Sequence, residues 1–217
     1  MLVSHNHKFI FIKTIKTAGT STEIFLEPYC IRNLQESHSR IMKKTNEGIV
    51  GTRMDQRQAE KSEFYNHMSP SEIKNKLGES LFNSYTKVAN IRNPFDILVS
   101  HYHFKPTYNL FTKKKLSFDD YLLNTNVVEK LSQKYKELLF INDKFIIDEV
   151  IRYENLSEDL NNLIIKLSLP NPKRKLSNYK VSKERDGIPY QKFYKEETIK
   201  KVEENFNFYI DLFKYHF

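Results

Sequence analysis

A short apolar run that leads into a polar, glycine-containing turn is the feature that most limits what this chain can fold into. Residues 9–13 read Phe-Ile-Phe-Ile-Lys, which has the length and bulk of a buried β-strand. The turn Lys16-Thr-Ala-Gly-Thr-Ser21 follows, and the pattern becomes helical from Thr20 to about Ile31. A strand, a turn and a helix in this order favour an α/β fold.

Strand-like and helix-like segments continue to alternate along the chain. Further strands are predicted at Tyr85–Ile91 and Phe145–Tyr153, whereas residues 32–66 read as polar and irregular. Helices are predicted after the capping box Ser69-Pro-Ser-Glu72, at 94–108, from Ser117, at 156–167 and at the C-terminal end. This order predicts an α/β sandwich on a mainly parallel sheet. Because no repeat or linker divides the chain, we expect a single domain over residues 1–217.

Composition limits the class of protein. Apolar residues make up 39% of the 217, which is enough for a packed core and argues against disorder. The single cysteine, Cys30, cannot form an internal disulfide, which suits a reducing compartment. The apolar runs are too short for a signal peptide or a membrane span. We therefore expect a soluble, cytoplasmic protein without a membrane partner.

The net charge of +8 is consistent with several kinds of anionic partner. Basic residues concentrate between Lys173 and Arg185, whereas Lys113-Lys114-Lys115 reads as a solvated loop. No recognition module for DNA or RNA is readable around the basic stretch, so a nucleic-acid partner is not expected.

The turn at residues 16–21 has the chemistry of an anion site. Gly19 allows a phosphate to approach the backbone closely, and the amides at the start of a helix point at an anion. Thr20 and Ser21 add hydroxyl donors, and Lys16 adds a mobile positive charge. The alternative is an ordinary strand–helix turn with a capping threonine, which does not require all of these residues together. The lysine precedes the glycine, which is the reverse of the Walker A order and weakens a kinase or NTPase interpretation.

A second motif, Arg92-Asn93-Pro94, ends the strand at Tyr85–Ile91, and Ser100 follows about two turns into the next helix. A guanidinium and a hydroxyl on rigid elements can form a second phosphate site. The alternative is that Arg92 pairs with Asp96 and that Ser100 lies on a polar helix face.

Together the motifs resemble those of the sulfotransferases that use 3′-phosphoadenosine 5′-phosphosulfate (PAPS). Residues 9–21 resemble the family's 5′-phosphosulfate loop, and Arg92 through Ser100 resemble its 3′-phosphate motif with the same spacing. Residues 151–156 are similar to a later strand of the family, and residues 212–217 resemble the end of its carbohydrate-type branch. The likeness covers most of the chain except residues 32–66.

The resemblance implies a P-loop-like, sulfotransferase-type three-layer sandwich. It implies an enzyme that transfers a sulfuryl group from PAPS to a hydroxyl or amine, with carbohydrates among the acceptors, and that releases 3′-phosphoadenosine 5′-phosphate without a metal. Lys16 would stabilise charge on the oxygen that bridges phosphate and sulfate. Arg92 and Ser100 would hold the 3′-phosphate. The 5′-phosphate would be held by the rest of the loop, Thr17, Ala18, Gly19, Thr20 and Ser21.

A general base must take the proton of the acceptor, and histidine suits this role because its pKa lies near neutrality. His67 is the predicted base, since relatives in the carbohydrate branch often have a histidine at a similar place; the alternative is a surface or capping-loop histidine. Tyr153 would approach the adenine or else pack in the core. Lys183 and Arg185 would contact the nucleotide or else belong to a solvated loop.

Two positions depart from the family pattern. Ile15 stands where the common proline would be, and Lys13 stands where many relatives have histidine, but neither change removes a phosphate ligand. Two rival functions stay open. One is a nucleotide-dependent P-loop kinase, and the other is a non-catalytic module that binds an anionic glycan or nucleic acid.

Overall fold

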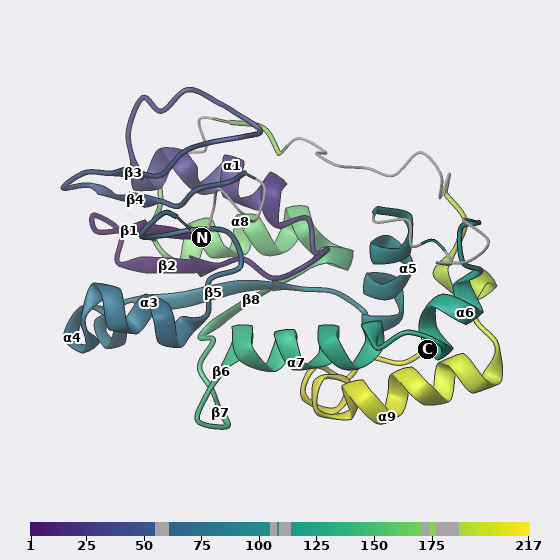
Figure 1. The fold of residues 1–217 in the computed structure, drawn as a ribbon. Coiled ribbons are helices and arrows are strands. Elements are labelled where there is room, and N and C mark those ends of the chain that lie inside the picture. Colours follow the sequence, from purple (N-terminus) through teal and green to yellow (C-terminus); the bar gives the residue numbers. More distant parts are fainter. Residues whose placement is uncertain (55–60, 105–107, 109–113, 171–173, 177–186) are drawn as a thin grey trace. The chain divides into compact units, whose positions relative to one another are not determined.

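The computed structural model describes the chain apart from residues 55–60, 105–107, 109–113, 171–173 and 177–186 (Figure 1). The described residues form two compact units. The first unit comprises Met1–Ile91 and Lys136–Tyr179, and the second comprises Arg92–Tyr135 and Lys180–Phe217.

A mixed β-sheet lies at the centre of the first unit (Figure 1). Among the described residues its six strands follow the order β3 (Lys43–Lys44), β4 (Gly48–Val50), β1 (Leu2–Ser4), β2 (Phe9–Ile12), β5 (Thr86–Ile91) and β8 (Glu149–Arg152). The pairs β2–β5 and β5–β8 are parallel, whereas β1 pairs antiparallel with β2 and β4, and β3 with β4. Four of these six strands therefore run in one direction, which is compatible with the predicted α/β fold on a mainly parallel sheet.

The register of the parallel strands brings their carboxyl ends to one edge of the sheet. Ile12 lies opposite Ala89, and Ala89 lies opposite Val150. The loop that follows β2 therefore starts beside the end of β5. This is the edge at which open α/β sheets bind their ligands.

Both faces of β2 are buried, because its side chains alternate between two covered sides of the sheet. Phe9 and Phe11 share one buried cluster with side chains of α1 (Gly19–Cys30) and α8 (Leu156–Lys166). The core on this face also includes Leu2, Phe25, Leu26, Tyr29, Cys30, Val50, Val88, Ile151, Leu160 and Leu163. Cys30 is a free, buried thiol, and burial raises its pKa well above the usual value.

The predicted capping box starts α3 (Pro70–Leu77) and is confirmed. Ser69 Oγ accepts from the Glu72 N–H at 3.3 Å, and Glu72 Oε2 accepts from the Ser69 N–H at 2.9 Å. The helix ends at Gly78, whose φ of 87° suits glycine, and α4 (Glu79–Ser84) follows.

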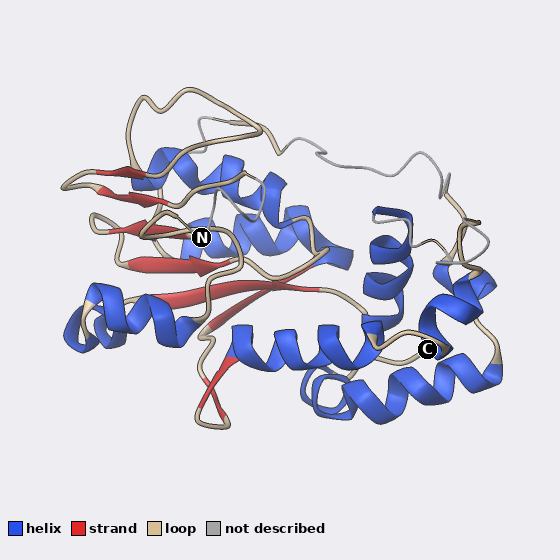
Figure 2. Ribbon diagram, viewed as in Figure 1, coloured by secondary structure: helices blue, strands red, loops and turns tan. Residues whose placement is uncertain are grey.

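The described part of the second unit consists of helices and loops (Figure 2). Its elements are α5 (Pro94–Phe104), α6 (Phe118–Leu123), most of α7 (Val127–Leu139), the 3₁₀ helix η2 (Tyr190–Phe193) and α9 (Glu196–Phe213). The aromatic ring of Tyr209 packs 5.1 Å from that of Tyr135 and 4.7 Å from that of Phe213. The predicted start of α6 is confirmed, because Ser117 Oγ accepts from the Asp120 N–H at 3.1 Å.

The predicted strand at 145–153 is wrong in its bounds. Only Glu149–Arg152 pairs in the central sheet, and Tyr153 already belongs to the 3₁₀ helix η1 (Tyr153–Asn155). The preceding residues form a separate hairpin of β6 (Phe140–Ile141) and β7 (Lys144–Phe145). Asn142 and Asp143 both have a positive φ, 49° and 59°, as a two-residue hairpin turn of type I′ requires.

Two further boundaries differ from expectation. Residues 32–66 are not wholly irregular, because they contribute β3 and β4 to the sheet. The helix predicted to run to about 108 ends at Phe104 among the described residues, and 105–107 lie outside them.

Candidate functional site

The loop between β2 and α1 has the backbone geometry of an anion-binding turn. Lys16 and Ala18 adopt left-handed φ values of 59° and 60° on either side of Thr17. Helix α1 starts at Gly19, and its N-cap residue, Ala18, makes no side-chain capping bond. Such a start directs backbone N–H groups and the positive end of the helix dipole toward an anion. A non-glycine residue in this backbone region costs roughly 1–2 kcal/mol, and strain of this kind concentrates at functional sites.

Buried polar side chains support this loop from the sheet. Thr14 Oγ1 donates to the backbone oxygen of Asn90 at 2.6 Å, so it accepts from Thr17 Oγ1 at 2.7 Å. Asn90 Nδ2 donates to the backbone oxygen of Thr17 at 2.8 Å and to Thr22 Oγ1 at 2.7 Å. All of these residues are buried, so water does not compete for the bonds. Asn90, on β5, therefore ties the loop to the neighbouring strand.

Gly19 is required for a reason that the sequence did not reveal. A Cβ atom at this position would lie 2.7 Å from Lys13 Cγ and 3.2 Å from Lys13 Cε. The stem of Lys13 therefore passes directly beside the first residue of α1. The predicted reason, close approach of a phosphate, stays a prediction.

Lys13 belongs to a buried ion-pair network. Its Nζ donates to Glu23 Oε2 at 2.6 Å and to Asn66 Oδ1 at 3.2 Å. Glu23 also pairs with the Met1 amino group at 2.5 Å and with Arg53 Nη1 at 3.3 Å. Burial by itself would raise the pKa of Glu23, but the charges of Lys13, Met1 and Arg53 hold that pKa well below its usual range. Glu23 is therefore a carboxylate that neutralises Lys13.

His67 lies against the end of β2. Its Nδ1 is 3.0 Å from the backbone oxygen of Lys13. Because a carbonyl oxygen can only accept, Nδ1 carries the hydrogen and Nε2 carries the lone pair. Desolvation by burial, followed by the charge of Lys13, lowers the pKa of His67 to about 3, so the imidazole is neutral at pH 7. Ser69 and Glu72 form the capping box of α3, and His67 lies in the loop just before it.

Arg92 forms the ion pair that the sequence left open as an alternative. Its Nε and Nη2 lie 2.8 Å and 2.7 Å from Asp96 Oδ2. Tyr209 OH holds its backbone, since the oxygen lies 3.1 Å from both the N–H and the C=O of Arg92. Ser100 is partly exposed on α5 and follows Asp96 by four residues, which puts it on the same helix face. A phosphate bound here would share the oriented guanidinium with Asp96.

The remaining predicted nucleotide contacts are Tyr153, Lys183 and Arg185. Tyr153 is 37% exposed and follows β8, so it is not a packed core residue. Lys183 and Arg185 lie outside the described residues.

Sequence reasoning missed several residues that organise the site. Asn90 had a visible signal, because an asparagine interrupts an otherwise apolar strand. Glu23 had a weaker one, since it directly precedes the apolar run Ile24–Leu26 of α1. Asn66 and Tyr209 had no local signal, because their partners are distant in sequence.

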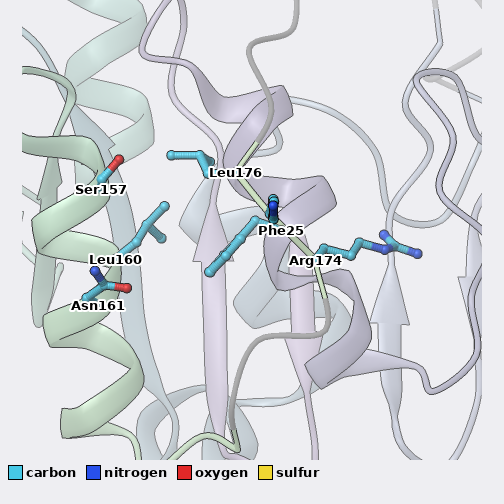
Figure 3. A pocket seen from close by; sticks show the side chains of 7 residues that line it. Phe25, Ser157, Leu160, Asn161, Arg174 and Leu176 are labelled. Atoms are coloured by element: carbon cyan, nitrogen blue, oxygen red, sulfur yellow. The ribbon is translucent and has the colours of Figure 1, made fainter.

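A cavity of about 430 Å³ lies in the first unit beside α1 and α8 (Figure 3). The side chains that line it are Phe25, Ser157, Leu160, Asn161, Arg174, Lys175 and Leu176. None of the predicted site residues that the structure describes lines this cavity, so the β2–α1 loop and the cavity are separate features.

Within the described ranges, no cluster of three His, Cys, Asp or Glu side chains could hold a metal ion. None of the described helices combines the length and apolar character needed to cross a membrane.

The comparisons with known proteins agree with the motifs. The pattern of the sulfotransferase domain matches residues 3–169, which include the β2–α1 loop, His67, Arg92 and Ser100. A protein from Archaeoglobus fulgidus, whose printed name is "Uncharacterized protein", is 34% identical over 100 residues, which cover 45% of this chain and 80% of that protein. No solved structure matches the chain. Because the domain match covers most of its length, the protein belongs to the sulfotransferase domain family.

Proposed function

We propose that this protein is an enzyme that transfers a sulfuryl group from PAPS to a hydroxyl or amine acceptor and releases 3′-phosphoadenosine 5′-phosphate. The observation that carries the proposal is the strained loop Lys16–Ser21, which leads from the sheet edge into an uncapped helix within the matched domain. We further propose that residues 1–217 form one domain with a P-loop-like, three-layer architecture of the carbohydrate-sulfotransferase type.

The loop would hold the 5′-phosphosulfate. The residues from Thr17 to Ser21 would contact the 5′-phosphate through backbone N–H groups and hydroxyls. The partly exposed Lys16 would stabilise the charge that develops on the bridging oxygen as its bond to sulfur breaks. The acceptor oxygen or nitrogen would form the new bond to sulfur from the opposite side.

His67 would accept the proton that the acceptor loses. Its Nε2 has the lone pair, because Nδ1–H is engaged by the backbone oxygen of Lys13. In the ligand-free protein the low pKa of His67 keeps the ring neutral and available. A bound anionic donor near the ring would oppose the repulsion from Lys13 and raise the pKa of His67 toward the range of an effective base.

Separate residues would recognise the nucleoside. Arg92 and Ser100 would hold the 3′-phosphate, which distinguishes PAPS from simple adenylates. Tyr153 would approach the adenine from the end of β8, and Lys183 and Arg185 would add positive charge. Acceptors would be hydroxyls or amines, with carbohydrates as the first class to test.

A thermal-shift comparison of adenine nucleotides tests the donor. Binding of 3′,5′-adenosine bisphosphate at 100 times its Kd should stabilise the fold by about 2.7 kcal/mol, whereas 5′-AMP at the same concentration should stabilise it much less. Transfer of labelled sulfate from PAPS to a panel of sugars would then identify the acceptor class.

The same measurements separate the rivals. Stronger stabilisation by ATP with Mg²⁺, together with ATP turnover, would establish a kinase instead. Binding to anionic glycan or nucleic acid that weakens steeply with salt, without any sulfate transfer, would establish a binding module.

A further inference from the structure

Lys13 contacts two successive residues of one turn, Asn66 through its side chain and His67 through its backbone. Its ammonium donates to Asn66 Oδ1 at 3.2 Å, and its backbone oxygen accepts from His67 Nδ1–H at 3.0 Å. The sequence separation is large, because these contacts span 53 and 54 positions. A single lysine therefore joins the end of β2 to the turn that carries the proposed base.

The lysine is itself held firmly. Its ammonium pairs with Glu23 Oε2 at 2.6 Å, and both side chains are at most 5% exposed. The absence of a Cβ at Gly19 gives the lysine stem its path beside α1. Separating a buried ion pair leaves an uncompensated charge, so the ammonium is kept in place.

A second contact holds the backbone of the turn at Asn66 and His67. The Asn66 N–H donates to the backbone oxygen of Thr52 at 3.0 Å. His67 has a left-handed φ of 57°, which sets the direction in which its ring leaves the backbone. Thr52 therefore fixes the backbone of the turn, and Lys13 fixes the side chains on it.

We propose that Lys13, anchored by Glu23 and linked through Asn66, is a positioning residue that holds the His67 ring with hydrogen on Nδ1 and the lone pair on Nε2. The inference rests on the proposed function, in which Nε2 takes the acceptor proton. Lys13 touches no reacting atom in this scheme. It acts by making one ring orientation and one tautomer of His67 the stable state.

Replacing Asn66 tests the link without breaking the buried ion pair. Asn66→Ala removes the acceptor for the lysine ammonium but leaves Lys13 and Glu23 paired. Asn66→Asp restores an acceptor at the same reach and serves as the rescue variant. Asn66→Ser, which is too short to reach the ammonium but stays polar, is a second test if the alanine variant does not fold. Asn83→Ala, at an exposed position of α4, is the matched control.

The first readout is the tautomer of His67 in the protein without any ligand. Nitrogen-15 NMR of the imidazole separates the two tautomers, and the signal of His67 is assigned among the seven histidines by its loss in His67→Asn. We expect Nδ1–H in the wild type, a mixture of tautomers in Asn66→Ala, and recovery of Nδ1–H in Asn66→Asp. An unchanged tautomer in both Asn66→Ala and Asn66→Ser would overturn the proposal.

The second readout is sulfate transfer. Asn66→Ala should lower kcat by about 10-fold while the KM for PAPS stays within about 2-fold, because the base is misplaced but the donor site is not. A changed tautomer with an unchanged kcat would overturn the catalytic part of the proposal. Absence of transfer by the wild type would instead remove the proposed function, and the ligand-free NMR result would still decide whether Asn66 fixes the ring.

Discussion

The acid sensitivity of folding offers a direct test of where His67 lies. The perturbation is His67→Asn, because asparagine tolerates the left-handed backbone at this position better than most residues. An asparagine amide can also donate to the Lys13 backbone oxygen that now accepts from His67. The variant therefore removes a titrating group with little change in shape.

The size of the effect follows from the two protonation states. In the folded protein, burial and then the charge of Lys13 lower the pKa of His67 to about 3, whereas in the unfolded chain it is roughly 6.5. Above pH 6.5 both states hold a neutral ring, and His67 does not affect stability. Below it the unfolded chain binds a proton that the folded protein excludes, so stability falls as the pH drops toward 3. Between pH 7.5 and 5.0 this loss amounts to about 2 kcal/mol.

Urea unfolding of both proteins at several pH values between 7.5 and 5.0 measures this loss. We expect the free energy of unfolding to fall by about 2 kcal/mol more in the wild type than in His67→Asn. The pKa values of His5 and His7 are also lowered by burial, but both residues are present in the two proteins and cancel in the difference. The pKa of Glu23 lies far below this range, so its protonation does not contribute. Equal pH dependence of the two proteins would refute the reasoning.

Three further substitutions address the loop and the phosphate contacts. Lys16→Ala should lower kcat for sulfate transfer by roughly 10²–10³-fold and change the free energy of unfolding by less than about 0.5 kcal/mol. Lys76→Ala, at an exposed position, is the control, and a wild-type kcat in Lys16→Ala would contradict the proposed role. Arg92→Ala should weaken 3′,5′-adenosine bisphosphate about 10- to 100-fold by calorimetry and spare 5′-AMP, so equal weakening of both would argue against a 3′-phosphate contact. Asn90→Ala should destabilise the fold by about 1–3 kcal/mol in urea unfolding, because the backbone oxygen of Thr17 loses its buried donor. A loss below about 0.5 kcal/mol would show that the loop is held in another way.

The elements that carry the site were predictable because their signals are local. The apolar run of β2, the turn at Lys16–Ser21 and the start of α1 lie within a few residues of each other. The caps at Ser69 and Ser117 likewise depend only on neighbours along the chain. Local hydrogen bonds and periodicity decide such features, and the sequence displays both.

Strand bounds were less predictable, because pairing depends on distant segments. The run from Phe145 reads as one strand, yet only Glu149–Arg152 meets β5, and Phe145 pairs with Phe140 of β6 instead. The very short β1 and β4 carry too few residues for a recognisable pattern, and only their antiparallel partners make them strands.

The sequence alone determined the strand–loop–helix unit, the motifs at Lys16–Ser21 and at Arg92 to Ser100, and the family. The tertiary structure decided what their polar groups do. In the folded protein Lys13 is buried and paired with Glu23, Asn90 donates to the backbone oxygen of Thr17, and His67 donates to the backbone oxygen of Lys13. A buried charge or amide must find a partner inside the fold, and that partner is whichever polar group the packing brings near, not a neighbour in the chain.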